Sequence, residues 1–203
     1  AEKQAAILRA EAEKQAAILR ADGEAQAIRM VQQALADSMG MLATVMNAIA
    51  VAGFSAGGHL VTSVSVFFDY GKDDGDEIDK VSCRPDFTIP CYPVIDMESF
   101  GHQGSTDNLL GEDASPELKE KYSLYKQVTK DTPPAFLWHT YDDGAVPVRN
   151  SIEYAKALEA NGVECSLHIY PHGPHGLGLA SDWKDVSTWT MLCGLWLDYI
   201  TKK

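Results

Sequence analysis

The chain has 203 residues, of which 45% are hydrophobic, and a formal net charge of −12. This length and composition allow one packed domain with an appended segment. The acidic balance argues against nucleic acid as a partner and against a basic patch that binds anionic lipid. No signal peptide is visible, which favours a cytoplasmic location, and the longest uncharged run, 38–68, is broken by glycine and polar residues, so we expect no membrane span.

Residues 1–11 recur as residues 12–22 with a single difference, at the last position. Their Ala, Glu, Lys, Gln and Leu favour a helix, and a period of 11 residues keeps an apolar stripe nearly straight along it. The sequence therefore predicts a helical, coiled-coil-like arm over 1–48, through which the chain associates with itself. These residues resemble the coiled coil of stomatin/prohibitin-like (SPFH) proteins. A solvated spacer helix without a partner is the alternative.

The segment 53–57 reads Gly-Phe-Ser-Ala-Gly and follows the apolar run 49–52. At a sharp turn from strand to helix, small neighbours let a serine project its hydroxyl above the sheet, and the following helix directs its positive end at the same place. The pattern predicts Ser55 as a nucleophile. An ordinary turn serine is the alternative, and partner residues are needed to decide between the two.

Such a nucleophile needs a histidine base and a carboxylate, which can follow in the chain order serine, carboxylate, histidine. An apolar, aromatic run at 135–141 predicts a strand that ends at Asp142 and Asp143. A helical pattern over 148–160 and a second strand at 164–170 follow. Beyond that strand lies a loop with two histidines, His172 and His175. The His-x-x-His spacing is also compatible with a metal pair, but no third ligand stands out, so we expect no metal.

These motifs resemble an esterase of the α/β-hydrolase superfamily, near its acetyl-esterase and acetyl-xylan-esterase-like branch. The resemblance covers the chain from about Val51 to its end. It rests on Gly-Phe-Ser-Ala-Gly-Gly-His-Leu (53–60), Cys-Tyr-Pro-Val-Ile (91–95), Asn-Leu-Leu-Gly (108–111), Thr-Pro-Pro-Ala-Phe-Leu-Trp-His-Thr (132–140), Asp-Gly-Ala-Val-Pro-Val (143–148) and His-Gly-Leu-Gly-Leu (175–179).

The resemblance implies Ser55 as nucleophile, Asp143 as the acid and His175 as the base, and it implies no cofactor. Asp143 is preferred to Asp142 because in the family two residues separate the aspartate from Val-Pro. His175 is preferred to His172 because a glycine and an aliphatic residue follow the family histidine. The backbone N–H of Ala56 is the expected oxyanion donor.

The resemblance also implies early strands and a Gly-rich loop ahead of the elbow, which we do not find in 1–50. We therefore expect an α/β fold over 51–203, a partial α/β-hydrolase fold with a mostly parallel sheet, preceded by the helical arm. The change of composition near Val51 indicates a mosaic chain: a natural fusion, an engineered chimera or a join of separate pieces. The expected function is a serine hydrolase that acts through an acyl-enzyme on small carboxylic esters, acetylated carbohydrate among them. The alternative is an oligomerising scaffold in which the hydrolase part is inactive.

Overall fold

The computed structural model describes residues 48–73 and 75–202. The chain divides into two units, 1–46 and 47–203, and the account below concerns the second. Residues 1–47 of the predicted helical arm lie outside the described residues. Within them, no helix is both long enough and apolar enough to cross a membrane.

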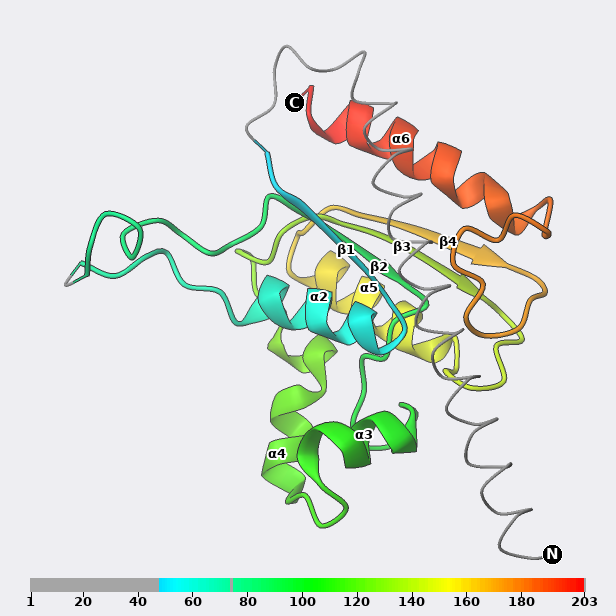
Figure 1. Ribbon diagram of the computed structural model, residues 1–203, viewed down its shortest axis with the longest axis horizontal. Coiled ribbons are helices and arrows are strands. Elements are labelled where there is room, and N and C mark those ends of the chain that lie inside the picture. The colour runs from blue at the N-terminus through cyan, green and yellow to red at the C-terminus, as the bar shows by residue number, and fades with distance from the viewer. Residues whose placement is uncertain (1–47, 74, 203) are drawn as a thin grey trace, which may run out of the picture. The chain divides into compact units, whose positions relative to one another are not determined.

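A four-stranded, wholly parallel sheet forms the centre of the second unit (Figure 1). The strands lie side by side in chain order. Every side chain of the third strand is buried, as expected for an apolar run inside a parallel sheet covered on both faces. The strands are β1 (Ala50–Phe54), β2 (Phe87–Cys91), β3 (Ala135–Thr140) and β4 (Cys165–Tyr170).

Helices cover the two faces of the sheet. In Figure 1, α6 (Trp189–Ile200) lies on one face, and α2 (Ala56–Val66) and α5 (Arg149–Ala160) lie on the other. Helix α6 buries Trp189, Cys193 and Trp196. This helix begins directly after the short 3-10 turn η2 (Val186–Thr188).

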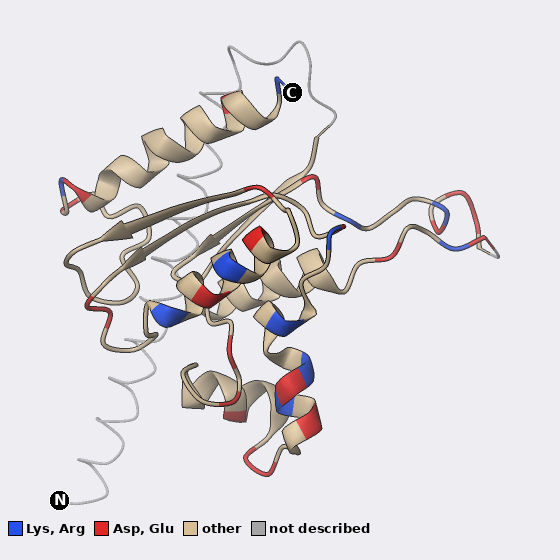
Figure 2. Cartoon of the chain, turned by 180° about the vertical axis from the view of Figure 1, so that it is seen from behind, with Lys and Arg blue, Asp and Glu red and all other residues tan. Residues whose placement is uncertain are grey.

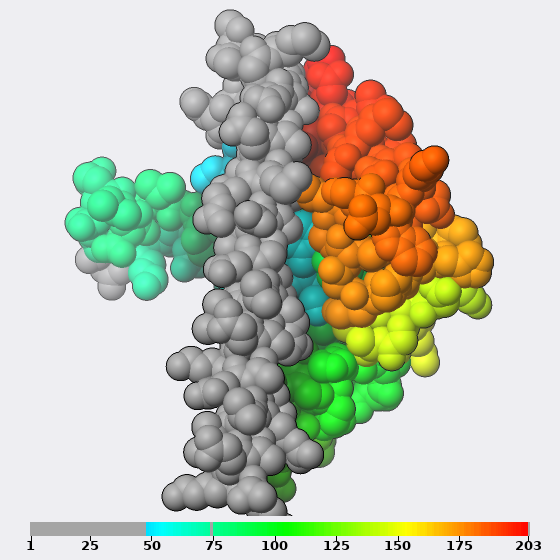
Figure 3. Space-filling view, turned by 45° about the vertical axis from the view of Figure 1, so that its right-hand side comes forward, coloured from blue at the N-terminus to red at the C-terminus, as the bar shows by residue number. Residues whose placement is uncertain are grey.

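Two connections leave the layered body. Residues 67–73 and 75–86, which lie between α2 and β2, stand away from it (Figures 1 and 3). Between β2 and β3 lie three short elements, α3 (Gln103–Leu110), α4 (Pro116–Tyr122) and the 3-10 turn η1 (Leu124–Gln127). Acidic and basic side chains alternate along α4, whereas α6 carries little charge (Figure 2).

The predicted α/β architecture of 51–203 is confirmed.

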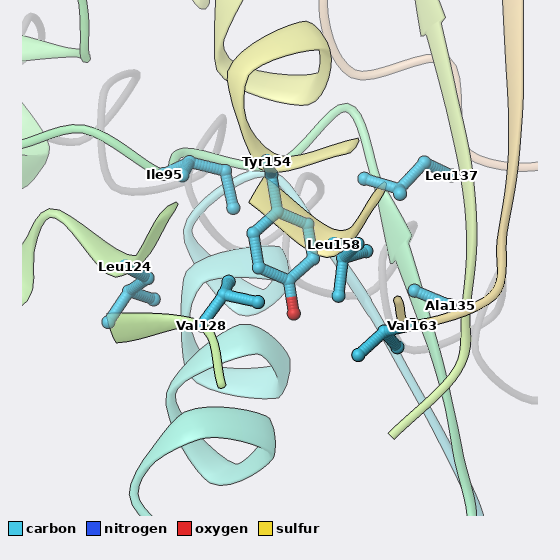
Figure 4. Close-up of a cluster of buried hydrophobic side chains, with 8 residues drawn as sticks. All are labelled: Ile95, Leu124, Val128, Ala135, Leu137, Tyr154, Leu158 and Val163. Carbon is cyan, nitrogen blue, oxygen red and sulfur yellow. The ribbon is translucent and has the colours of Figure 1, made fainter. Parts of the chain in front are cut away.

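One hydrophobic cluster joins α5, the sheet and η1 (Figure 4). Tyr154 of α5 lies fully buried at its centre with its hydroxyl directed at α2, where it is 2.9 Å from the Ser65 Oγ. Burial raises the pKa of the Tyr154 phenol, so the group stays neutral. The other buried members of the cluster are Ile95, Leu124, Val128, Ala135, Leu137, Leu158 and Val163.

We expect Tyr154→Phe to lower the free energy of unfolding by about 1 kcal/mol, because it removes one hydrogen bond and keeps the ring. Tyr154→Ala should cost about 3–5 kcal/mol, because it also empties the centre of the cluster. Urea unfolding monitored by circular dichroism measures both values. Equal losses in the two variants would contradict a role for the ring in packing.

Candidate active site

The carboxyl ends of the four strands meet at one edge of the sheet, and each is followed by a residue of the candidate site. Ser55 follows β1, Tyr92 follows β2, Asp143 lies just beyond β3, and His175 lies in the loop after β4. Parallel strands place such residues close together because all their carboxyl ends point the same way. Among the described residues, the non-glycine residues with positive φ are Ser55, Tyr92 and Ala180, all on these connections.

Ser55 occupies a tight turn between β1 and α2, with φ 55° and ψ −118°. A Cβ at Gly53 would lie 2.3 Å from the Gly57 carbonyl oxygen, and one at Gly58 would lie 2.7 Å from Pro93. Glycine is therefore required at 53 and 58 for the strand and helix to approach each other. The Ser55 N–H donates to the Cys91 carbonyl at 3.0 Å, which fixes the turn to the end of β2.

A continuous chain of hydrogen bonds joins the predicted site residues. The Ser55 Oγ lies 2.7 Å from the His175 Nε2, and the His175 Nδ1 lies 2.7 Å from the Asp143 Oδ2. The side chain of Asp143 is 1% exposed and that of His175 is 22% exposed. The imidazole thus contacts a buried carboxylate on one side and is partly exposed to solvent on the other.

Asp143 is a buried carboxylate whose negative charge is stabilised by its hydrogen bonds. Burial alone would raise the pKa of Asp143, but hydrogen bonds from His139, His175 and two backbone N–H groups outweigh it and hold the pKa well below its usual range. The N–H groups of Ala145 and Val146 both donate to the Asp143 Oδ1 at 2.9 Å. One oxygen is thereby held by the loop, and the other faces the histidines.

His139 is a contact of Asp143 that the sequence did not reveal. Its fully buried Nε2 lies 3.3 Å from the Asp143 Oδ2 and 2.9 Å from the Val146 carbonyl, to which it donates. Its Nδ1 lies 2.8 Å from the Ser151 Oγ and accepts from it. From sequence alone, alternation within the strand predicts His139 to be a core or face residue, and no motif distinguishes it.

The alternative site residues, Asp142 and His172, pair with each other. The Asp142 Oδ2 lies 2.9 Å from the His172 Nδ1, and the Asp142 Oδ1 accepts the Gly173 N–H at 2.8 Å. The hydrogen bond with His172 is the largest of the effects that lower the pKa of Asp142. Both side chains are largely exposed and stand outside the Ser55 chain of hydrogen bonds.

Ala56 is the first residue of α2 and is exposed beside Ser55. Its position places a backbone N–H at the positive end of the helix, next to the serine hydroxyl. Within the described part of the chain, no group of three or more His, Cys, Asp and Glu side chains is placed to hold a metal ion.

Known proteins similar to this chain include a xylanase and an acetylxylan esterase. Endo-1,4-beta-xylanase B of Butyrivibrio fibrisolvens is 41% identical over 134 residues, which are 66% of this chain and 21% of that protein. The acetylxylan esterase of Xylanibacter ruminicola is 38% identical over 159 residues, which are 76% of this chain and 31% of that protein. The chain thus spans less than a third of the length of these curated relatives.

Solved structures share the fold. An acetyl ester-xyloside bifunctional hydrolase from Caldicellulosiruptor lactoaceticus matches with 51% identity and a TM-score of 0.73, over 74% of this chain and 56% of that one. A carboxylesterase from Lactobacillus plantarum matches with 29% identity and a TM-score of 0.59, over 74% of this chain and 57% of that one. The sheet and its helices are therefore those of an α/β-hydrolase-like fold.

Residues 24–158 match the model of a protein family, BD-FAE. This match begins inside the segment assigned from the sequence to the helical arm, so similarity to the family extends upstream of Val51. It covers more than half of the chain and includes the serine elbow and Asp143. The chain belongs to the BD-FAE family.

Proposed function

We propose that this chain hydrolyses small carboxylic esters by way of a covalent acyl-enzyme formed on Ser55. The single observation that carries the proposal is the hydrogen-bonded series Ser55–His175–Asp143, with 2.7 Å at each step. A nucleophile, a base and an orienting carboxylate in this geometry meet the requirements of acyl transfer. The names of the relatives support esters of acetate on carbohydrate as the substrate class.

In the proposed reaction, His175 Nε2 takes the proton of the Ser55 hydroxyl as Oγ attacks the ester carbonyl. Asp143 stabilises the resulting imidazolium from the buried side and holds the ring in place. The Ala56 N–H, at the positive end of α2, donates to the oxyanion. His175 then returns the proton to the departing alcohol, and water repeats the sequence to release the acid.

We expect Ser55→Ala to lower the turnover of 4-nitrophenyl acetate by a factor on the order of 10⁴ or more, because the nucleophile is lost. A fluorophosphonate should label the wild-type chain once and leave the variant unlabelled, as intact mass will show. Ser63→Ala, a serine change within α2, the helix that follows Ser55, is the matched control. It should keep the wild-type turnover and the single fluorophosphonate label. An unlabelled but folded wild-type chain would favour the non-catalytic scaffold instead.

The two neighbouring aspartates provide a second test. Asp143→Asn should lower kcat by about 10⁴, because the amide favours the wrong tautomer of His175. Asp142→Asn makes the same chemical change outside the series and should cost far less. Steady-state kinetics of both variants measure the difference. The reverse order would assign the orienting role to Asp142 and contradict the proposal.

The low pKa of Asp143 predicts how stability depends on pH. The folded protein holds this pKa below the unfolded value of about 3.9. The Asp143 charge therefore makes its full contribution to the free energy of unfolding above that pH, and this contribution is lost as the pH falls through the folded pKa. The difference in free energy of unfolding between wild type and Asp143→Asn should be constant above about pH 5 and shrink below about pH 4. A difference independent of pH between 3 and 7 would show that the charge does not contribute.

The substrate class can be tested separately by measuring acetate release from acetylated xylan. We expect release by the wild-type chain and none by Ser55→Ala. Hydrolysis of 4-nitrophenyl acetate without release from the polymer would restrict the proposal to small free esters. Self-association through residues 1–48 stays a prediction, to be checked by light scattering.

A further inference from the structure

The loop that carries His175 has an anchored glycine on each side of the histidine. Residues 171–180 connect β4 to the segment before α6 and contain three glycines, at 173, 176 and 178. A loop of this composition has little intrinsic preference for one conformation. Contacts from outside the loop must therefore fix the position of the imidazole.

The upstream anchor is Gly173, which β3 holds from its carboxyl end. The Asp142 Oδ1 accepts the Gly173 N–H at 2.8 Å, and the Thr140 hydroxyl donates to the Gly173 carbonyl at 2.8 Å. Both backbone polar groups of this glycine are thus bound by side chains. The anchor also brings the loop next to Asp143.

The downstream anchor is Gly178, which two aromatic side chains hold. The Tyr92 hydroxyl accepts the Gly178 N–H at 2.9 Å, and the Trp189 Nε1–H donates to the Gly178 carbonyl at 3.1 Å. Tyr92 comes from the end of β2 and Trp189 from the first turn of α6. These bonds therefore tie the loop to a strand and to the helix layer at once.

The same aromatic residues form a buried group that reaches the imidazole. The Tyr92 ring packs edge-on against His175, with centroids 5.1 Å apart, and against Trp138, with centroids 4.9 Å apart. Trp138 stacks on Trp189 at 5.2 Å. All three aromatic side chains are buried, at 5% exposure or less.

The backbone of Tyr92 adds a second, independent observation. Its φ of 35° is unusual for a bulky residue and is energetically unfavourable. Such a conformation persists only where the surroundings over-determine it. Here the Tyr92 N–H donates to the Trp138 carbonyl at 2.8 Å, and its ring and hydroxyl are held as described.

We propose that Tyr92 and Trp189 are positioning residues, which hold the N–H and C=O of Gly178 and thereby keep the His175 Nε2 within hydrogen-bond reach of the Ser55 Oγ. The inference rests on the proposed function and extends it to side chains outside the Ser55–His175–Asp143 series. A displacement of the base by about 1 Å lowers turnover strongly, by about 100-fold in known cases. Neither residue needs to contact the substrate for this effect.

The test uses Tyr92→Phe and Trp189→Phe, each of which removes one bond to Gly178 and keeps an aromatic ring. We expect each to lower kcat by about 5- to 10-fold with KM unchanged, as the loss of one hydrogen bond implies. Amide hydrogen exchange in peptides covering 172–180 should accelerate by a similar factor. Tyr154→Phe removes a buried tyrosine hydroxyl bond away from this loop and is the matched control, so its loop exchange and kcat should equal those of wild type.

Unchanged loop exchange in both variants would overturn the inference, and so would an equal fall of kcat in Tyr154→Phe. Circular dichroism and the urea midpoint identify a variant that fails to fold. The other of the two variants then tests the inference alone. Failure of the proposed function is a separate result: the wild-type chain would not be labelled at Ser55, while exchange of residues 172–180 would still test whether Tyr92 and Trp189 hold the loop.

Discussion

The site depends on placing one negative charge, that of Asp143, where almost no water reaches it. A buried carboxylate is costly unless hydrogen bonds replace its hydration. The fold supplies them from the N–H groups of Ala145 and Val146 on one oxygen and from His139 and His175 on the other. The loop after β3 must therefore take one conformation, and the histidine loop after β4 must come to meet it.

The parallel sheet makes this meeting possible. Because β1, β2, β3 and β4 lie side by side in chain order, residues that are far apart in sequence leave the sheet at the same edge. Ser55 and His175 are 120 residues apart and 2.7 Å from each other through their side chains. The strain at Ser55 and Tyr92 is located at these strand ends, where the surrounding layers hold it.

Much of this arrangement could be predicted from the sequence, because the relevant signals are local. The apolar run 135–141 matches β3 to within one residue, and the elbow pattern at 53–57 matches the end of β1 and the start of α2. The choice of Asp143 over Asp142 and of His175 over His172 required family resemblance, since neighbouring residues of the same type differ only in which way the folded loop directs them.

The remaining features depend on contacts between distant segments, which no local pattern encodes. From the sequence alone, His139 is interpreted as a strand residue, Tyr92 as part of an apolar motif, and Trp189 as a core position of the last helix. Their contacts arise only when β2, β3 and α6 come together around the histidine loop. Gly58 is a similar case. A side chain at this position would collide with Pro93, which lies 35 positions later in the chain.

The most direct test of the central claim is the proton NMR signal of the His175 Nδ1–H. A proton held between an imidazole and a buried carboxylate exchanges slowly and resonates far downfield. We expect such a signal in the wild-type chain and in Ser55→Ala, and we expect it to disappear in Asp143→Asn. Its absence from the folded wild-type chain, or its persistence in Asp143→Asn, would contradict the proposed coupling between Asp143 and His175.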